Sequence, residues 1–329
     1  MLTSRLILIF ILLCVAVEGV TAQSPQGNDS QQLTEARELN AKTVKLYGEH
    51  KYEEALPLAL RVVDLVTTAF GKTDSHLILP LINLGDLYLA MLRADDAKAS
   101  FERALTIAQT SFGRTDMALT RPLDELGHLM RKAGEYQKAA DFFSRSLDIK
   151  QKLLKPTDVE IARAAYWAAE AYRLNRAFST AEPLYEQAIK LYDQAGIKDA
   201  ELVEALRRCL IVLTSENKKD KAALIQSRLA ELSAEQGIVE GGIVNGWAVK
   251  LAQPSYPLGA RGAHASGQVR VEVLIDESGN VISADAIGGH PLLQAASVAA
   301  AKESKFTPTL KSGVPVKVRG VIIYNFVIQ

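Results

Sequence analysis

Two kinds of hydrophobic pattern divide the chain, and one replaces the other near residue 240. Between residues 33 and 235, apolar residues such as Leu81, Leu84 and Tyr88 recur at the spacing of one helix face. From residue 268 to residue 328, apolar and polar residues mostly alternate, with a helical stretch between them, which is typical of half-buried strands around a helix. The pattern therefore predicts an all-α domain followed by a small α+β domain.

The helical part repeats with a period of 42 residues. The tetrapeptide "GKTD" at 71–74 returns as "GRTD" at 113–116 and as "KPTD" at 155–158. Three further positions keep this period: Ala55, Ala97, Ala139, Ala181 and Ala223; Leu84, Leu126, Ala168 and Leu210; Phe101, Phe143 and Tyr185. Each unit holds two helical stripes, which predicts helical hairpins that stack on one another to bury their apolar faces.

These hairpins resemble tetratricopeptide repeats, in the longer form typical of kinesin light chains. Small residues, such as Gly85 and Gly127, stand where two antiparallel helices must approach closely. The resemblance covers residues 33–235, with four clear repeats and a degraded fifth at 200–230. It implies a solenoid whose concave surface binds a peptide or partner protein, and the sequence does not identify that protein.

A glycine-rich segment, "GIVEGGIVNG" at residues 237–246, follows the repeats. Its composition predicts a flexible linker over residues 236–248. The segment lacks the G-x-G-x-x-G and GK[ST] patterns of phosphate-binding loops, so it gives no support to nucleotide binding.

Residues 249–329 predict an antiparallel sheet with one helix. Alternating valines around Val271 lead into "DESGN" at 276–280, which supplies hairpin-turn residues. A helix follows, with Pro291 at its first position and one face formed by three small or apolar residues: Leu292, Ala296 and Ala299. In the last alternating run, 316–328, Gly320 interrupts the apolar positions.

Five segments of this part resemble the C-terminal domain of TonB, the periplasmic protein that energises outer-membrane transporters. They are "QPSYPLGAR" at 253–261, "IDESGNVISA" at 275–284, "HPLLQAA" at 290–296, "FTPTLKSGVPVKV" at 306–318 and "YNF" at 324–326. The resemblance runs from about residue 241 to residue 329. In that family a Q-P-x-Y-P segment lies beside the sheet and helps to hold the TonB box, an extended transporter peptide that adds to the sheet edge.

Carried over residue by residue, the resemblance implies that Gln253, Tyr256, Pro257 and Arg261 bind peptide. A structural role fits Tyr256 and Pro257 equally well, because proline stiffens the segment and tyrosine buries a large ring. Gln253 fits the binding role better, since its amide can pair with a peptide backbone.

The N-terminus predicts a secretory signal peptide over residues 1–22. Arg5 precedes a 12-residue apolar run, and small residues end the segment at "VTA". The alternative is an inner-membrane anchor, although 12 helical residues span about 18 Å of a hydrocarbon core of roughly 30 Å. Residues 23–32 are polar and predict a disordered leader. Cleavage would leave Cys209 as the single cysteine, expected as a small core residue.

Composition and spacing argue against other functions. Lys+Arg and Asp+Glu are equal at 38 each, whereas nucleic-acid binders usually carry a basic excess. His50, His76 and His128 are scattered, without the clustered spacing of metal ligands. We therefore expect no catalytic residue, metal, cofactor or nucleic-acid partner.

The two resemblances predict a periplasmic adaptor: the TonB-like domain captures an extended peptide and the repeats recruit another protein. The alternative is an inner-membrane-anchored TonB-type energy transducer for TonB-dependent transport. Such transducers keep an N-terminal membrane helix and a long Pro-rich spacer, whereas here the apolar segment is short and helical repeats replace the spacer. These departures argue against force transmission and leave peptide binding intact. The transporter and the oligomeric state are left open.

Overall fold

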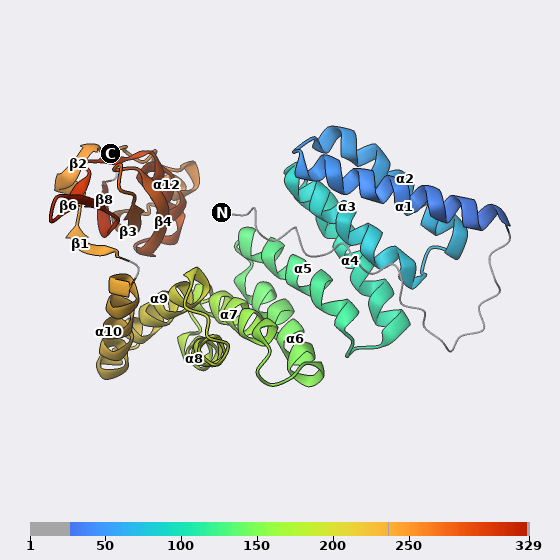
Figure 1. Cartoon of the computed structure of the whole chain (residues 1–329), viewed down its shortest axis with the longest axis horizontal. Helices are drawn as coiled ribbons and strands as arrows, with labels where there is room; N and C mark the ends of the chain where they lie inside the picture. Colours follow the sequence, from blue (N-terminus) through green and yellow to red (C-terminus); the bar gives the residue numbers. More distant parts are fainter. Residues whose placement is uncertain (1–26, 236, 328–329) are drawn as a thin grey trace. The chain divides into compact units, whose positions relative to one another are not determined.

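The computed structural model describes residues 27–235 and 237–327 (Figure 1). The chain divides into two compact units, with the boundary between Arg114 and Thr115. The predicted signal peptide, residues 1–22, lies outside the described residues, as do residues 23–26 of the predicted leader. Among the helices that are described, none is long and apolar enough to cross a membrane.

The first unit contains two helical pairs. Its elements are α1 (Gly27–Gly48), α2 (Tyr52–Phe70), η1 (Ser75–Leu77), α3 (Ile78–Ala90) and α4 (Ala94–Phe112). Helix α1 includes residues 27–32, where the composition predicted disorder. Gln31 and Gln32 are good helix formers, and α1 packs along α2, so a polar composition does not prevent a helix here.

The second unit begins with three more helical pairs. Its helices are η2 (Met117–Leu119), α5 (Thr120–Lys132), α6 (Tyr136–Leu153), α7 (Val159–Leu174), α8 (Phe178–Gln194), α9 (Ala200–Ser215) and α10 (Lys219–Glu235). The periodic aromatic residues Phe143 and Tyr185 are buried between them. The predicted series of helical hairpins is confirmed.

The recurrent Thr-Asp motif marks the boundary between successive pairs. Gly71 and Gly113 end their helices with φ values of 95° and 80°, which glycine adopts without a steric cost. The carboxylates of Asp74, Asp116 and Asp158 each accept a hydrogen bond from the backbone N–H two residues later, at 2.8–2.9 Å. Each aspartate therefore caps the helix that follows it.

The fifth pair is shifted by one residue, which explains its degraded sequence pattern. Its capping residue, Asp199, lies 41 residues after Asp158 instead of 42. In α10 the buried alanine is Ala222, whereas the period predicted Ala223. Cys209, only 1% exposed, takes the buried position of the periodic leucines. Burial also raises the pKa of the Cys209 thiol to about 12, so this residue serves as a core side chain.

Close approach of paired helices depends on glycine. A Cβ atom at Gly85 would lie 2.4 Å from the Phe101 ring, and one at Gly127 would lie 2.8 Å from the Phe143 ring. Both distances are shorter than a carbon–carbon contact allows. The predicted close approach of paired helices at Gly85 and Gly127 is therefore confirmed.

The C-terminal domain is a four-stranded sheet in the order β1-β8-β3-β4, with α12 packed on β3, β4 and β8. The sheet strands are β1 (Val239–Ile243), β3 (Gly267–Ile275), β4 (Val281–Gly288) and β8 (Val318–Phe326). The smaller elements are η3 (Asn245–Trp247), β2 (Ala248–Lys250), α11 (Leu258–Gly262), α12 (Pro291–Glu303), β5 (Lys305–Phe306), β6 (Thr309–Lys311) and β7 (Val314–Val316). The strands β3, β4 and β8 are antiparallel, as predicted, while β1 runs parallel to β8.

Alternation along β3 and β8 produces the core of this domain. Val271 on β3 and Ile322 on β8 are paired in register and fully buried. At the predicted turn, the Asp276 carboxylate accepts hydrogen bonds from the backbone N–H groups of Asn280 and Ser278 at 2.8 and 2.9 Å. These bonds, first of all the one from Asn280, lower the pKa of Asp276.

The buried face of α12 differs from the predicted one. Leu293, Ser297 and Ala300 face the core, whereas Leu292 is 46% exposed. In an alanine-rich helix two adjacent stripes have similar hydrophobicity, so the sequence pattern does not separate them. The pattern was further obscured by Ser297, whose hydroxyl is hidden in the core and donates to the Leu293 carbonyl at 2.9 Å.

Strand β1 lies in the segment that was predicted to be a flexible linker, residues 236–248. Its glycines permit close packing. A Cβ atom at Gly241 would lie 2.7 Å from Val318 Cγ1, and one at Gly320 would lie 2.3 Å from Val244 Cγ1. Glycine content predicts a flexible segment, whereas here the glycines leave room for neighbouring side chains. The same packing explains why Gly320 interrupts the apolar alternation of β8.

Candidate peptide-binding site

The outer edge of β8 is only partly covered by β1. The parallel register pairs Val239 with Val318 and Ile243 with Val321, so β1 ends about halfway along β8. At the two ends of β1, Val239 N–H donates to the Lys317 carbonyl at 2.9 Å and Val244 N–H donates to the Val321 carbonyl at 3.0 Å. An outer strand with uncovered backbone groups is the feature on which another strand can pair.

Asn245 continues the covering of this edge with its side chain. Its Nδ2 donates to the Ile323 carbonyl, and its Oδ1 accepts from Ile323 N–H, both at 2.8 Å. The amide thus takes the place of one residue of a paired strand. Backbone groups of alternate residues face the same edge, so those of Asn325 point outward as well.

The "QPSYP" segment lies against the far end of β8. The Tyr256 ring meets the Phe326 ring edge-on, with 5.5 Å between the ring centres and an interplanar angle of 86°. The Tyr256 hydroxyl donates to the Ala265 carbonyl. Ahead of the tyrosine, Ala252 N–H donates to Ser304 Oγ at 3.1 Å. These contacts fix the segment to the domain.

The structure brings three of the four predicted site residues together. The Pro257 carbonyl accepts from Arg261 N–H at 3.1 Å, which starts α11. The Arg261 guanidinium lies 5.6 Å from the centre of the Tyr256 ring, within cation–π range. Gln253, at the other end of the segment, is exposed and outside this group. The contacts give Tyr256 a structural role, and the binding roles of all four residues remain predictions.

Two ion pairs connect the last repeat to the sheet within the second unit. Arg207 Nη1 on α9 lies 2.6 Å from Glu272 Oε2 on β3, and Arg208 Nη2 lies 3.2 Å from Asp285 Oδ1 on β4. Burial raises the pKa of Glu272, while the nearby positive charge of Arg207 opposes this rise. The sheet face away from α12 is therefore held against α9 by charged groups.

Arg319 adds a third connection, between α10, β1 and β8. Its guanidinium donates to Ser233 Oγ on α10 and to Glu240 Oε1 on β1, the latter at 3.2 Å. The side chain is 8% exposed. Burial lowers the pKa of Arg319, and the positive charge of Arg207 lowers it further.

A buried carboxylate lies inside the repeats next to these contacts. The two carboxylate oxygens of Glu170 accept from Arg173 at 2.7 and 2.8 Å, and the Tyr185 hydroxyl donates to Glu170 at 2.6 Å. Burial acts to raise the pKa of Glu170, but the charge of Arg173 and these hydrogen bonds outweigh it and lower the pKa to about 2. Glu170 is therefore ionised and satisfied, which does not fit a proton-transfer role.

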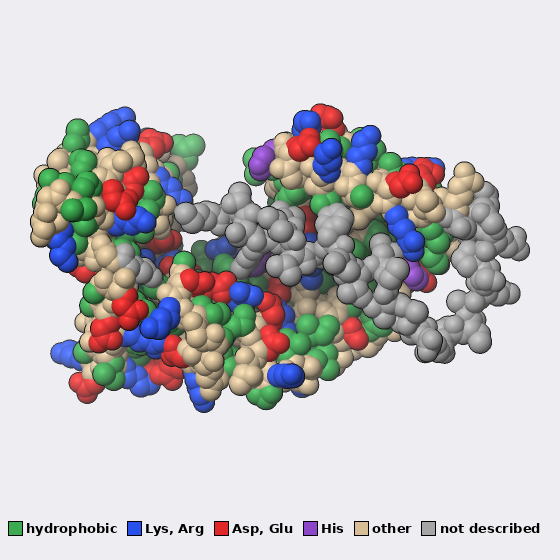
Figure 2. All heavy atoms as spheres, in the orientation of Figure 1, with side chains coloured by type: hydrophobic (Ala, Val, Ile, Leu, Met, Phe, Trp, Pro, Cys, Tyr) green, Lys and Arg blue, Asp and Glu red, His purple; other side chains and the backbone are tan. Residues whose placement is uncertain are grey.

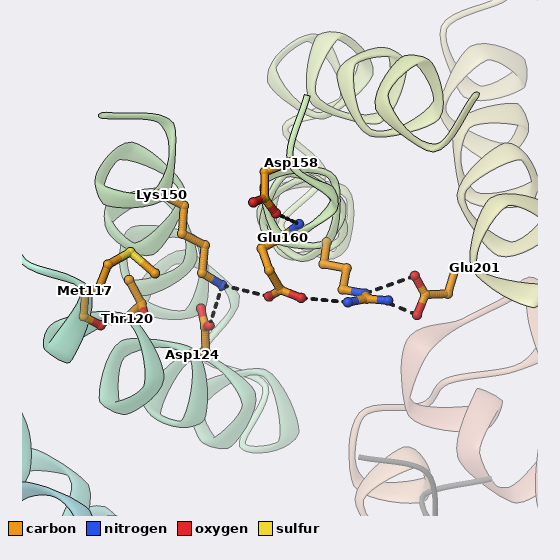
Figure 3. A network of polar contacts seen from close by, with 8 residues as sticks. Met117, Thr120, Asp124, Lys150, Asp158, Glu160 and Glu201 are labelled. Carbon is orange, nitrogen blue, oxygen red and sulfur yellow. Dashed lines mark hydrogen bonds and ion pairs between the residues drawn. The ribbon is translucent and has the colours of Figure 1, made fainter. Parts of the chain in front are cut away.

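A second polar network crosses the repeats from α5 to α9 (Figure 3). Lys150 Nζ lies 3.0 Å from Asp124 and 3.8 Å from Glu160. Arg163 continues the chain, at 2.6 Å from Glu160 and 3.0 Å from Glu201. Because these charges are paired with one another, the network connects successive helical pairs.

The described residues contain no group of three or more His, Cys, Asp or Glu side chains arranged to hold a metal ion. On the face drawn in Figure 2, positive and negative side chains are interspersed over both units, without an extended patch of one sign.

The sequence pattern did not predict β1, the bonds of Asn245 or the arginines that join the repeats to the sheet. One signal was present in the sequence. Gly320 stood in an apolar position of an alternating strand, and an isolated glycine in a strand can indicate that another chain segment approaches closely. Arg207 and Arg208 gave no signal, because arginine on a helix most often faces solvent.

Comparison with protein families agrees with this architecture. The model for the Gram-negative bacterial TonB protein C-terminal matches residues 252–328, and the tetratricopeptide repeat model matches residues 44–110 and 116–194. The chain thus carries a TonB-type C-terminal domain after tetratricopeptide repeats. No curated protein matches the chain by sequence.

Solved structures show the same repeat fold. BtubC (BKLC) from P. vanneervenii is 17% identical, with a TM-score of 0.55, and the match covers 70% of this chain and 95% of that chain. Kinesin light chain TPR-like repeats from Podosopora anserina are 14% identical, with a TM-score of 0.54, and the match covers 64% of this chain and 99% of that chain. At these identities the comparison shows the fold alone.

Both matched families are protein-interaction modules, so the chain has a protein–protein interaction role. The TonB-type domain indicates a protein of the cell envelope.

Proposed function

We propose that this chain is a periplasmic adaptor that joins two proteins and has no enzymatic activity of its own. Its C-terminal domain captures an extended peptide at the β8 edge, such as the TonB box of an outer-membrane TonB-dependent transporter. Its repeats recruit a second protein on the concave surface of the solenoid. A signal peptide at residues 1–22 exports the chain to the periplasm.

The single observation that carries this proposal is the incomplete covering of β8. Strand addition gains affinity from backbone hydrogen bonds and specificity from alternate side chains. Beyond Ile323, which pairs with Asn245, the outward backbone groups of Asn325 extend the edge. Tyr256 packs on Phe326 at that end, so the "QPSYP" segment borders it. Gln253 lies in the same segment and is exposed, so its amide is available to bond with the backbone of an extended peptide.

The ion pairs between α9 and the sheet support the adaptor role. They hold the TonB-type domain against the last repeats in one compact unit. Stacked repeats use their extended concave surface for binding. The second unit could then bind a peptide on β8 and a protein on its repeats at the same time.

Calorimetric titration of the full-length chain with N-terminal segments of outer-membrane transporters tests the peptide-binding half. We expect Gln253→Ala to weaken binding about tenfold, the loss of roughly one hydrogen bond to backbone, with an unchanged melting temperature. Gln226→Ala, an exposed glutamine on α10, is the matched control and should bind as wild type does. If Gln253→Ala binds every segment as tightly as wild type, "QPSYP" is only a brace.

The N-terminus separates the adaptor from the membrane-anchored energy transducer. Mass spectrometry of the protein taken from envelope fractions should show a chain that begins at Gln23. A chain that begins at Met1 and stays with the inner membrane would favour the transducer. Crosslinking in the same fractions, followed by identification of the captured proteins, would name the partners of the repeats.

A further inference from the structure

We infer that Val239–Ile243, strand β1, is a resident strand on the peptide-binding edge of β8, and that the partner peptide binds fully by replacing it. This inference rests on the proposed peptide-binding function. It defines the ligand surface as the whole outer edge of β8, and it defines the partner as a parallel, extended segment with the side-chain pattern of β1.

Strand β1 occupies the hydrogen-bonding groups that an added strand would use. It pairs with β8 from Val318 to Val321, and Asn245 then bonds both backbone groups of Ile323. A peptide that docks beside Phe326 thus finds only the end of the edge open. It gains the remaining backbone bonds of β8 when β1 leaves.

The side chains of strand β1 itself are little buried. Glu240, Gly242 and Ile243 are exposed, the last of them to 63%. The register shifts between Glu240 and Gly242, and Gly242 has a φ of 62°. A five-residue strand with two glycines gains little from side-chain packing and loses much chain entropy. Segments with few buried apolar contacts open locally at low free-energy cost.

The contacts of β1 specify the side chains of a replacing peptide. Glu240 pairs with Arg319, whose guanidinium is nearly buried, so the edge favours an acidic residue at this position. Gly241 faces Val318 at a distance that leaves no room for a Cβ atom, so the next position favours a small residue. The fully buried Val244 fixes an apolar position three residues later. The fitting partner therefore carries five residues in this order: an acidic residue, a small residue, two residues of any kind and an apolar residue.

A strand tethered in the same chain competes at a high effective concentration. A free peptide should therefore bind the wild-type chain weakly, and more tightly once β1 is loosened. The probe is a fluorescent synthetic peptide of residues 237–246 of this chain, measured by anisotropy against the full-length protein. It already carries the pattern that the β8 edge accepts.

Gly241→Val loosens β1, because its side chain would collide with Val318. We expect the probe to bind Gly241→Val at least about tenfold more tightly than wild type, since the competing strand is weakened. Gly246→Ala is the matched control, because a Cβ atom there meets nothing within 4 Å, and it should bind as wild type does. Equal affinity of the folded Gly241→Val and wild-type chains would overturn the inference.

A disulfide that locks β1 provides a second, reversible measurement. Ile243 and Val321 are partners in the register, so Ile243→Cys and Val321→Cys can be joined. We expect the chain that carries both cysteines together with Gly241→Val to lose probe binding when the disulfide forms. Reduction of the disulfide should restore binding. The two single-cysteine chains should bind in either condition. Undiminished probe binding by the oxidised chain would contradict the inference.

The same chains, titrated with transporter N-terminal segments, separate this inference from the proposed function. If the probe binds Gly241→Val while no transporter segment binds any chain, the inference that β1 can be replaced is supported and the proposed ligand is wrong. If a transporter segment binds the locked and the reduced chains equally, the peptide-binding function stands and the replacement of β1 fails.

Discussion

Arg207 on α9 and Glu272 on β3 form an ion pair with 2.6 Å between Nη1 and Oε2, and their side chains are 17% and 19% exposed. The two residues come from different domains of the predicted architecture. Because the pair is largely buried, removing Arg207 takes away the main counter-charge of Glu272, with Arg319 as the second positive neighbour. The pair therefore joins the folding of the sheet to that of the last repeats.

We expect Arg207→Ala to destabilise the second unit by about 2–4 kcal/mol, since it leaves Glu272 buried without this counter-charge. Glu272→Gln should cost less, because it removes the charge that needs compensation. Urea denaturation followed by circular dichroism measures both. Lys152→Ala, in an exposed pair with Asp148, is the control and should cost no more than about 0.5 kcal/mol. Equal effects of Arg207→Ala and Lys152→Ala would show that the α9–sheet contact is not stabilising.

The pKa of Glu170 predicts how acid affects the repeats. Burial raises this pKa, but Arg173 and the hydrogen bonds to the carboxylate lower it from 4.5 to about 2. A carboxylate with a lowered pKa in the folded state stabilises the fold fully above its unfolded pKa. This contribution is then lost as the pH falls from 4.5 to about 2.

The melting temperatures of wild type and Glu170→Gln should therefore differ most at neutral pH and approach each other between pH 4.5 and pH 2. Differential scanning calorimetry across this range measures the convergence. Glu277→Gln, at an exposed position of the β3–β4 turn, is the control and should follow the wild-type profile. A difference between wild type and Glu170→Gln that stays constant down to pH 2 would contradict the lowered pKa.

The sequence predicted the repeats well because each helical pair is specified locally. Asp74 caps the helix that follows it, and Gly85 faces Phe101 of the same pair, so the 42-residue period records contacts within short stretches of chain. The fifth pair does not follow this period, because it lies one residue earlier in the chain, which places Asp199 and Cys209 out of phase.

Contacts between distant segments were not predictable in the same way. Val239 pairs with Val318, and Arg208 meets Asp285, across 79 and 77 residues of chain. No local propensity records such pairing, and a glycine-rich strand has the composition of a linker. The position of Tyr256 was predictable in part. Its motif indicated a place beside the sheet, while only the structure shows its contact with Phe326.

Gly85→Ala tests the close approach of α3 and α4. The added methyl group would lie 2.4 Å from the Phe101 ring, so the pair must separate, at a cost of about 1–3 kcal/mol. Gly48→Ala, where a Cβ atom meets nothing within 4 Å, is the control and should be neutral or slightly stabilising. Adding Phe101→Leu to Gly85→Ala should recover part of the loss. Chemical denaturation of wild type, Gly85→Ala, Phe101→Leu and the double variant gives the coupling energy. Strictly additive effects would show that these two residues do not share the space.

Stepwise substitution of Tyr256 separates the contribution of its hydroxyl from that of its ring. Tyr256→Phe removes the hydrogen bond to the Ala265 carbonyl and keeps the ring against Phe326, so it should cost about 0.5–1.5 kcal/mol. Tyr256→Ala also removes the packed ring of this half-buried residue and should cost more, roughly 2–3 kcal/mol.

The proposed peptide binding should follow the same order, because Tyr256 holds the "QPSYP" segment, which includes Gln253, against Phe326. Melting curves and calorimetry with the same transporter segments, run on the full-length chain, measure stability and affinity together. Leu258→Ala, whose side chain is 85% exposed in α11, is the matched control and should leave both unchanged. If Tyr256→Ala lowers the melting temperature and yet binds as tightly as wild type, the tyrosine braces the domain without shaping the peptide-binding edge.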